Sequence, residues 1–168
     1  MTRLALIAAL VLGWTASAGA QITYRAPEGD FVIDFPMAPT VETRPAHRSH
    51  DVALRRYEDN ENSRAFSVRI EEYPDNALPP SPNGATYDRL LRSYAGDDPT
   101  SLKSTRPARL SGRPCLEGVF VDMEGDTRVV RVLMLGERIY QVAYIHAEGA
   151  DEPGVAEAYF GSFKITAP

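Results

Sequence analysis

Apolar and polar side chains alternate along much of this chain, with a period of two that is typical of β-strands. Near the start of the pattern, Phe31, Ile33 and Phe35 share one face of a short strand that ends at Pro36. Valine and aspartate stand between them, so the opposite face is more polar. The alternation predicts a strand with one apolar side.

A β-hairpin is expected next along the chain. Residues 52–57 have the composition of a strand, and the turn-forming residues 58–62 follow them. A further strand then carries Phe66, Val68 and Ile70 on one face. We predict that these two strands pair with each other.

A proline-rich segment, residues 74–84, separates the hairpin from a predicted helix. Three prolines within four positions exclude a helix or a central strand there, which leaves a spacer or a recognition loop. Asn83 or Thr86 is expected to cap the helix, at about 85–95, and Gly96 to end it. The helix is indicated by apolar residues at helical spacing: Tyr87, Leu90, Leu91 and Tyr94.

Residues 116–146 predict a three-stranded antiparallel meander. Gly125-Asp126 and Gly136-Glu137 are glycine-led turn signals, which suit two-residue hairpin loops. Pairing residues outward from these two-residue loops gives the register of the strands, which assigns each residue to one face of the meander. One face carries Val119, Val121, Met123, Val130, Val132, Met134, Ile139, Ala143 and Ile145. The other carries Phe120, Val129, Leu133, Tyr140, Val142 and Tyr144, with Asp122 and Arg131 among them.

Both faces of this meander are apolar, so each must be covered. The helix at about 85–95 is expected on one face. A second helix, from Asp151 to about Phe160 and ended by Gly161, is expected on the other. Residues 162–165 then form a terminal strand. The predicted fold class is α+β, a mostly antiparallel β-sheet sandwiched by helices.

The first twenty residues have the pattern of a secretory signal peptide. Arg3 precedes an apolar run, and small residues then offer a cleavage site after Ala20. The apolar run is too short to span a bilayer stably, and Gln21 offers no thiol for a lipid anchor. We expect 1–20 to be removed and 21–168 to form a single α+β domain, soluble and periplasmic or secreted.

The composition limits the classes of partner that the chain is expected to bind. Without Arg3 the mature chain carries 23 acidic and 17 basic residues, a net charge of −6. The chain has no basic tract, so neither nucleic acid nor an anionic membrane surface is an expected partner. Cys115 is the only cysteine, which excludes an internal disulfide. We expect it to be a small buried apolar residue, with a reactive thiol or a disulfide to another chain as the alternatives.

Four features in order resemble the PsbP-like group of small α/β/α sandwiches, in particular its exported bacterial members of the DcrB-like kind. They are residues 29–36, the helix around 87–94, the meander strand with 138–142, and the closing segment 159–165. Together they span nearly the whole mature chain. The resemblance implies a fold used for docking, since its members include an extrinsic photosystem subunit and a Ran-binding protein. No metal or partner motif of those members can be matched here, and a shared fold does not carry a function.

Arg131 is a charged residue on the apolar meander. The counted register places it diagonal to Asp122, within reach of Tyr140 and Tyr144. A guanidinium held among tyrosines would bind a carboxylate or phosphate. The alternative is a structural ion pair, or an arginine at the edge between helix and sheet. The candidate ligand-binding residues are therefore Arg131, Asp122, Tyr140 and Tyr144.

The histidines offer a weaker candidate site. His47, His50 and Asp51 have the side chains that zinc or copper binds, and His146 would join them if the chain folded back. In a strand, however, positions three apart point to opposite faces, so we expect solvated histidines and no metal. The sequence holds no hydrolase, metalloprotease, phosphate-loop or C-x-x-C motif. No cofactor and no catalytic residue is therefore expected.

These observations favour an exported, non-catalytic binding or accessory protein of the cell envelope, with an envelope protein as its partner. The alternative is a small-ligand binder that uses the Arg131 face for an anion, and an enzyme is least favoured. An exposed apolar patch near residues 78–80 would favour docking, and a closed cavity lined by Arg131 and tyrosines would favour a ligand. The sequence leaves the oligomeric state open.

Overall fold

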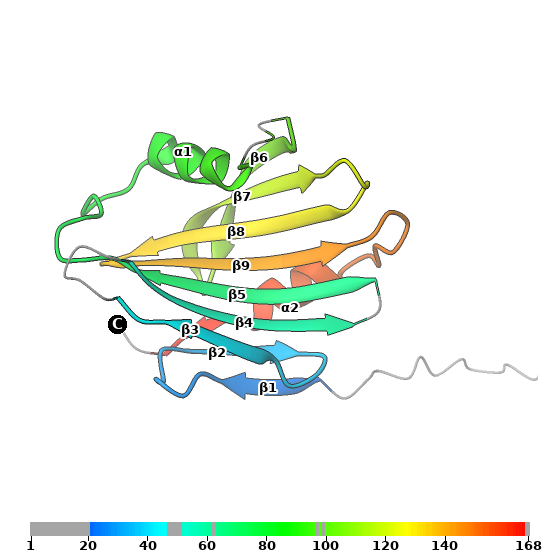
Figure 1. Ribbon diagram of the computed structural model, residues 1–168, viewed down its shortest axis with the longest axis horizontal. Coiled ribbons are helices and arrows are strands. Elements are labelled where there is room, and N and C mark those ends of the chain that lie inside the picture. Colours follow the sequence, from blue (N-terminus) through cyan, green and yellow to red (C-terminus); the bar gives the residue numbers. More distant parts are fainter. Residues whose placement is uncertain (1–20, 47–51, 62, 97, 99, 167–168) are drawn as a thin grey trace, which may run out of the picture.

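The structure, a computed structural model, describes residues 21–46, 52–61, 63–96, 98 and 100–166 (Figure 1). The predicted signal peptide lies outside this part. Every strand pair in the described part is antiparallel, which confirms the predicted α+β class. The elements, in chain order, are β1 (Ile22–Arg25), β2 (Phe31–Phe35), β3 (Thr40–Arg44), β4 (Ala53–Glu61), β5 (Arg64–Glu72), α1 (Gly84–Tyr94), β6 (Leu102–Leu110), β7 (Arg113–Val121), β8 (Thr127–Leu135), β9 (Arg138–His146), α2 (Val155–Ser162) and β10 (Lys164–Ile165).

The strands form two sheets. Seven lie in the order β3-β4-β5-β9-β8-β7-β6, and three in the order β1-β2-β10. The small sheet joins the two ends of the described chain, because Lys164 of β10 lies opposite Val32 of β2 and Ile165 lies opposite Phe31. Figure 1 shows α1 beside β6, β7 and β8, and β3 and β4 at the other end of the large sheet.

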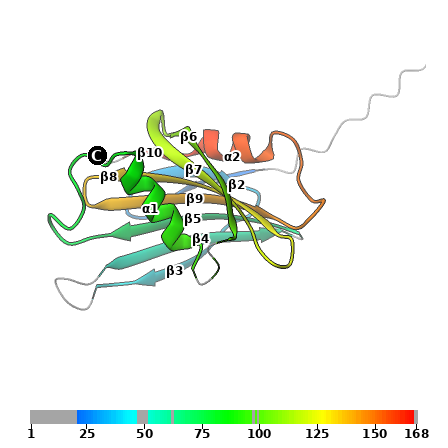
Figure 2. The same cartoon turned by 90° about the horizontal axis from the view of Figure 1, so that it is seen from above.

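Each side of the large sheet has its own core. On one side α2 and the small sheet pack on the strands, chiefly through aromatic residues: Phe31, Phe35, Tyr57, Phe66, Tyr140, Tyr144, Tyr159, Phe160 and Phe163. On the other side Leu91 of α1 is fully buried beside Phe120, Val130 and Val132. The prediction of helices on both faces is thus right for α1 and incomplete for α2, which lies beside β2 and β10 on its side (Figure 2).

The β8–β9 hairpin has the predicted register. Arg131 lies opposite Val142 and Leu135 opposite Arg138, which leaves Gly136-Glu137 as a two-residue loop. Gly136 has a φ of 58°, a left-handed conformation that glycine adopts without a steric penalty. The glycine-led turn signal was therefore read correctly at this position.

The predicted β7–β8 register is wrong. Thr127 lies opposite Val121 rather than Glu124, so residues 122–126 form a five-residue loop. Asp122 stabilises this longer loop, because its Oδ1 accepts hydrogen bonds from the backbone N–H groups of Glu124 at 2.9 Å and Asp126 at 3.0 Å. The shift is by an odd number of residues, which turns β7 over, so that Phe120 packs on the α1 side.

The β4–β5 hairpin forms with a shorter connection than predicted. Residues 58–61 continue β4 instead of turning, and only residues 62 and 63 connect the two strands. Phe66, Val68 and Ile70 share a buried face as predicted. Three strands were not predicted: β1, β3 and β6. Of these, β3 is exposed along its whole length and so shows no apolar alternation.

The helix α1 has the predicted caps. The Asn83 side chain accepts a hydrogen bond from the Thr86 backbone N–H at 3.0 Å, and Gly96, with a φ of 59°, follows the last turn. In contrast, α2 begins at Val155 and not at Asp151. Gly154 has a φ of 89°, which is incompatible with a right-handed helix, so the helix starts only after it.

Candidate functional site

Arg131 is buried in the structure, and partners from its own chain surround it. Its Nε donates to Glu117 Oε2 at 2.9 Å, its Nη2 to Glu157 Oε1 at 2.5 Å, and its Nη1 to the Arg109 carbonyl at 3.2 Å. The guanidinium also lies over the Phe160 ring, 4.4 Å from its centroid. All three nitrogens are thus used within the chain, which favours the structural ion pair over the ligand-binding interpretation.

The other predicted ligand residues are not gathered around Arg131 as expected. Asp122 belongs to the β7–β8 loop, where its carboxylate accepts hydrogen bonds from the backbone. Tyr140 and Tyr144 lie on the same side of the sheet as Arg131 but are buried in its aromatic core. The residue opposite Arg131 on β7 is Glu117, which the incorrect register had placed on the other face.

The charges in this buried cluster stabilise one another. Burial alone would raise the pKa of Glu117, but hydrogen bonds from Arg106 and Arg131 outweigh it and hold the pKa below its usual value. Burial likewise opposes the charge on Arg131, and its bonds to Glu157 and Glu117 raise its pKa instead. Both groups are therefore held in their charged forms, as a satisfied ion pair requires.

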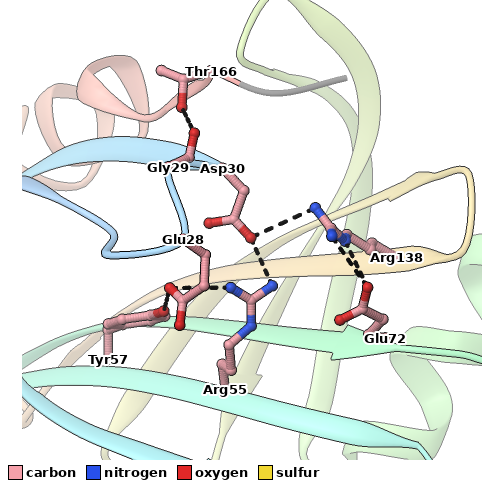
Figure 3. A network of polar contacts seen from close by, with 8 residues as sticks. All are labelled: Glu28, Gly29, Asp30, Arg55, Tyr57, Glu72, Arg138 and Thr166. Atoms are coloured by element: carbon pink, nitrogen blue, oxygen red, sulfur yellow. Dashed lines mark hydrogen bonds and ion pairs between the residues drawn. The ribbon is translucent and has the colours of Figure 1, made fainter.

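A second polar cluster, centred on the buried pair Asp30 and Arg55, connects the small sheet to the large one (Figure 3). Asp30, which is 2% exposed, accepts a hydrogen bond from Arg55 Nη2 of β4 at 2.6 Å, and Arg138 Nη1 of β9 lies 3.6 Å from the same oxygen. Glu28 accepts a hydrogen bond from Tyr57 at 3.0 Å and lies 3.2 Å from Arg55 Nη1. Arg138 also pairs with Glu72 Oε1 at 3.1 Å, so three carboxylates surround the two guanidiniums and the cluster acts as a clamp between the sheets.

Of the candidate metal ligands, only His146 belongs to the part of the chain that the structure describes. His47, His50 and Asp51 lie outside the described residues. His146 lies opposite Thr127, as the meander predicted, and its Nδ1 is 3.0 Å from the Ala147 carbonyl. Among the described residues no group of three histidine, cysteine or carboxylate side chains is arranged to hold a metal ion.

Cys115 is buried, as predicted, with 7% of its surface exposed. Burial raises the pKa of its thiol to about 11, although Arg131 nearby lowers it in part. A thiol that stays protonated at neutral pH is a poor nucleophile. The buried-residue interpretation therefore fits better than the reactive one.

The α1 side of the large sheet is open over β3 and β4, where the side chains of Arg44 and Arg56 are 70% and 46% exposed. Charged side chains cover this open face in cross-strand rows, and their ion pairs lie along single strands: Glu42–Arg44, Arg56–Glu58 and Arg69–Glu71. Arg56 lies directly opposite Arg69, and Arg69 opposite Gln141 of β9. The open face is therefore a solvated, charged surface with cationic groups side by side.

A cavity of about 210 Å³ lies on this face, which we call the arginine cavity. Three guanidinium side chains line it: Arg56 of β4, Arg69 of β5 and Arg128 of β8. The remaining lining residues are polar or aliphatic: Ser67, Tyr94, Val130, Gln141, Ala143 and Ile145. No carboxylate is among the residues that line it, so this cavity is a local cationic site on an acidic protein.

An apolar hollow of about 240 Å³ lies along the other part of α1. Leu78 and Pro79 of the proline-rich segment form one wall of this apolar hollow, and Leu90 of α1 forms another. Met134 and Ile139 also line it, from the hairpin ends of β8 and β9. The apolar hollow thus lies at residues 78–80, where an apolar patch favours protein docking.

Sequence reasoning missed the arginine cavity because it depends on register. The β4–β5 connection of two residues sets Arg56 opposite Arg69, and this pairing is lost when residues 58–62 are taken as a turn. A search for the shortest loop between the two strands could have found the pair. The approach of Tyr94 and Arg128 depends on how α1 packs, which carries no local sequence signal.

No protein-family model matches the chain, and no curated protein matches it. None of the helices among the described residues is long and apolar enough to cross a membrane.

Proposed function

We propose that this chain is an exported, non-catalytic binding or accessory protein of the cell envelope, and that it docks a partner protein on the α1 side of its large sheet. The observation that carries the proposal is the apolar hollow beside α1, where Leu78, Pro79 and Leu90 meet next to an open charged face. An apolar recess with a polar rim is the usual layout of a protein-binding surface.

Export rests on the sequence of residues 1–20, with its charge, apolar run and small-residue tail. The resemblance to the PsbP-like group, DcrB-like members in particular, adds a docking role by analogy. The observed layers, with α1 on one side of a large antiparallel sheet and α2 on the other, are compatible with that resemblance.

We propose that the protein is not an enzyme because its buried titratable groups serve the fold. Asp30 and Glu117 both pair with arginines, and the pKa of Cys115 is raised away from neutrality. A general base or nucleophile needs a group whose pKa lies near the working pH and whose reactive atom is accessible. These groups stabilise the fold instead.

The test is site-specific photo-crosslinking in the native envelope. A photoreactive residue replaces Arg89, which is exposed and lines the apolar hollow, and in a control it replaces Lys164 of β10, exposed in the other layer. We expect one reproducible partner band from position 89 and none from position 164. Equal bands from both positions, or no band from position 89, would overturn the proposal.

A pair of variants tests the apolar hollow itself. Leu78→Asp places a charge in its wall, whereas Ala77→Asp places the same charge on an exposed neighbour that does not line it. Loss of the crosslink in the first variant and its retention in the second is the expected result. Retention in both would show that the apolar hollow is not the contact.

A further inference from the structure

We propose that the arginine cavity binds an oxyanion, the carboxylate or phosphate group of a small molecule or of a partner. The inference adds the chemical class of a ligand to the proposed function. It rests on the proposed function only in assuming that the α1 side of the large sheet has a binding role. It is tested on the purified protein, so it can fail or succeed without the partner.

The placement of the three arginines is fixed by strand register. Arg56 and Arg69 are direct cross-strand neighbours. Arg128 lies opposite Ile145, four residues along β9 from the Gln141 that faces Arg69. At about 3.3 Å per residue and 4.8 Å per strand, the Cα atoms of Arg69 and Arg128 are about 16 Å apart. Their long side chains therefore approach the cavity from two sides.

Arg56 and Arg69 each pair with a carboxylate through one nitrogen, which leaves their other N–H groups available to a ligand. Arg56 Nη2 lies 2.7 Å from Glu58 Oε1, and Arg69 Nη2 lies 2.6 Å from Glu71 Oε1. The Nε of Arg69 is buried and has no hydrogen-bond partner in the described part of the chain. A buried donor without an acceptor is unfavourable, and a rotation of the 44% exposed Arg69 side chain would present this N–H to an oxyanion in the cavity.

The Arg128 side chain forms no ion pair and no hydrogen bond with the described residues, so its guanidinium is available to a ligand in the cavity. It is exposed on the strand next to the cavity. An arginine fork donates two parallel N–H groups, the geometry that matches carboxylate and phosphate oxygens.

Tyr94 adds a neutral donor at the wall between the cavity and the end of α1. Its hydroxyl accepts a hydrogen bond from Gln141 Nε2 at 2.5 Å. Burial, with Glu71 and Tyr73 nearby, raises the pKa of Tyr94 well above its usual value of 10. The hydroxyl therefore keeps its own proton to donate, so the cavity offers both charged and neutral donors to one anionic group.

The experiment is a titration followed through the arginine Nε–H resonances in ¹H–¹⁵N spectra. The probes are sodium phosphate and sodium succinate, with sodium chloride at equal ionic strength as the reference for screening. We expect at least one oxyanion to shift the Arg69 and Arg128 resonances along a saturable curve that chloride does not reproduce. Saturation by phosphate alone assigns a phosphate-bearing ligand, and saturation by succinate alone assigns a carboxylate.

Charge-matched variants locate the site. Arg128→Gln is expected to raise the Kd about tenfold, as loss of one charge-assisted bidentate contact would. Arg56→Gln should also weaken binding. Arg113→Gln removes the same charge from an exposed position of β7 outside the cavity and should leave the Kd unchanged. Curves that do not saturate, or equal weakening in all three variants, would overturn the inference, and a crosslinked partner would then still support the proposed function.

Discussion

Glu117 of β7 lies directly opposite Arg131 of β8, and its Oε2 accepts a hydrogen bond from Arg131 Nε at 2.9 Å. Both side chains are less than 10% exposed, at the edge of an aromatic core. The second oxygen of Glu117 accepts a hydrogen bond from Arg106 of β6 at 2.5 Å. One carboxylate thus holds arginines from the two strands that flank it, and three strands of the large sheet share one charge network.

Replacing Glu117 by glutamine should destabilise the protein strongly. The change keeps the shape but leaves Arg131 without its buried countercharge, and breaking a buried pair in this way costs about 3–5 kcal/mol. Urea unfolding measures the loss. The control is Glu157→Gln, because Glu157 is 60% exposed and a screened partner of this kind contributes about 0–1 kcal/mol. Equal losses in the two variants would contradict the assignment.

The stabilisation from Glu117 should depend on pH in one direction. Its pKa in the folded protein is lowered from the usual value of 4.5, so its contribution is complete above that value and is lost as the pH falls through the folded pKa. The unfolding free energies of the wild type and Glu117→Gln should therefore differ most near neutral pH and converge in acid. Urea midpoints measured for both proteins across this range give the comparison, and a constant difference would contradict it.

Alkaline pH should destabilise the protein through Cys115. Its pKa is raised from 9.0 to about 11, so above pH 9 the unfolded thiol loses its proton while the folded one keeps it. Stability then falls as pH rises, by up to about 1.4 kcal/mol per pH unit for one such group. Thermal unfolding of the wild type and of Cys115→Ala, measured between pH 9 and about pH 11, tests this fall in stability. We expect a shallower slope in the variant, and parallel slopes would count against a buried thiol.

Gly118 should resist replacement by alanine because α1 packs against it. A Cβ atom there would lie 3.1 Å from both Leu91 Cδ atoms and 3.1 Å from Phe120 Cε2. Overpacking of this kind costs about 1–3 kcal/mol. Gly161→Ala is the control, since a Cβ in that helical position meets nothing within 4 Å and should stabilise α2 by up to about 1 kcal/mol.

A double variant shows whether Leu91 is the cause. If the clash is with its side chain, Gly118→Ala should cost less in a Leu91→Ala background than in the wild type. Additive losses in urea unfolding would place the strain elsewhere.

The fold was predictable from the sequence where the signals were local. The apolar stripe of α1, its Asn83 cap and the Gly136 turn all depend on neighbouring residues, and the structure has each of them. The predicted length of the β7–β8 loop was wrong because Asp122 and Gly125 both favour turns. The five-residue loop is stabilised by side-chain and backbone hydrogen bonds of Asp122, which no local sequence pattern signals. One incorrect register was enough to pair Arg131 with the wrong acid.

The small sheet and the open face could not be predicted in the same way. The pairing of β10 with β2 joins residues from opposite ends of the chain, and nothing near Lys164 or Val32 signals it. β6 includes Pro107 and is mostly exposed, so its sequence lacks the alternation of a half-buried strand. The arginine cavity depends on the register of β4, β5, β8 and β9 and on the packing of Tyr94 of α1 beside them, which only the tertiary structure sets.

The place of β10 beside β2 sets the order in which the chain can finish folding. Phe163 stacks on Phe31 with ring centroids 5.6 Å apart, and the Ser162 hydroxyl accepts a hydrogen bond from the Asp34 backbone N–H. Until residues 160–166 have been synthesised, β2 lacks β10, one of its two neighbouring strands. Closing a loop of this length is entropically costly until those late contacts form. The small sheet therefore stays incomplete until the end of synthesis, and removing residues 160–166 should harm folding more than their number suggests.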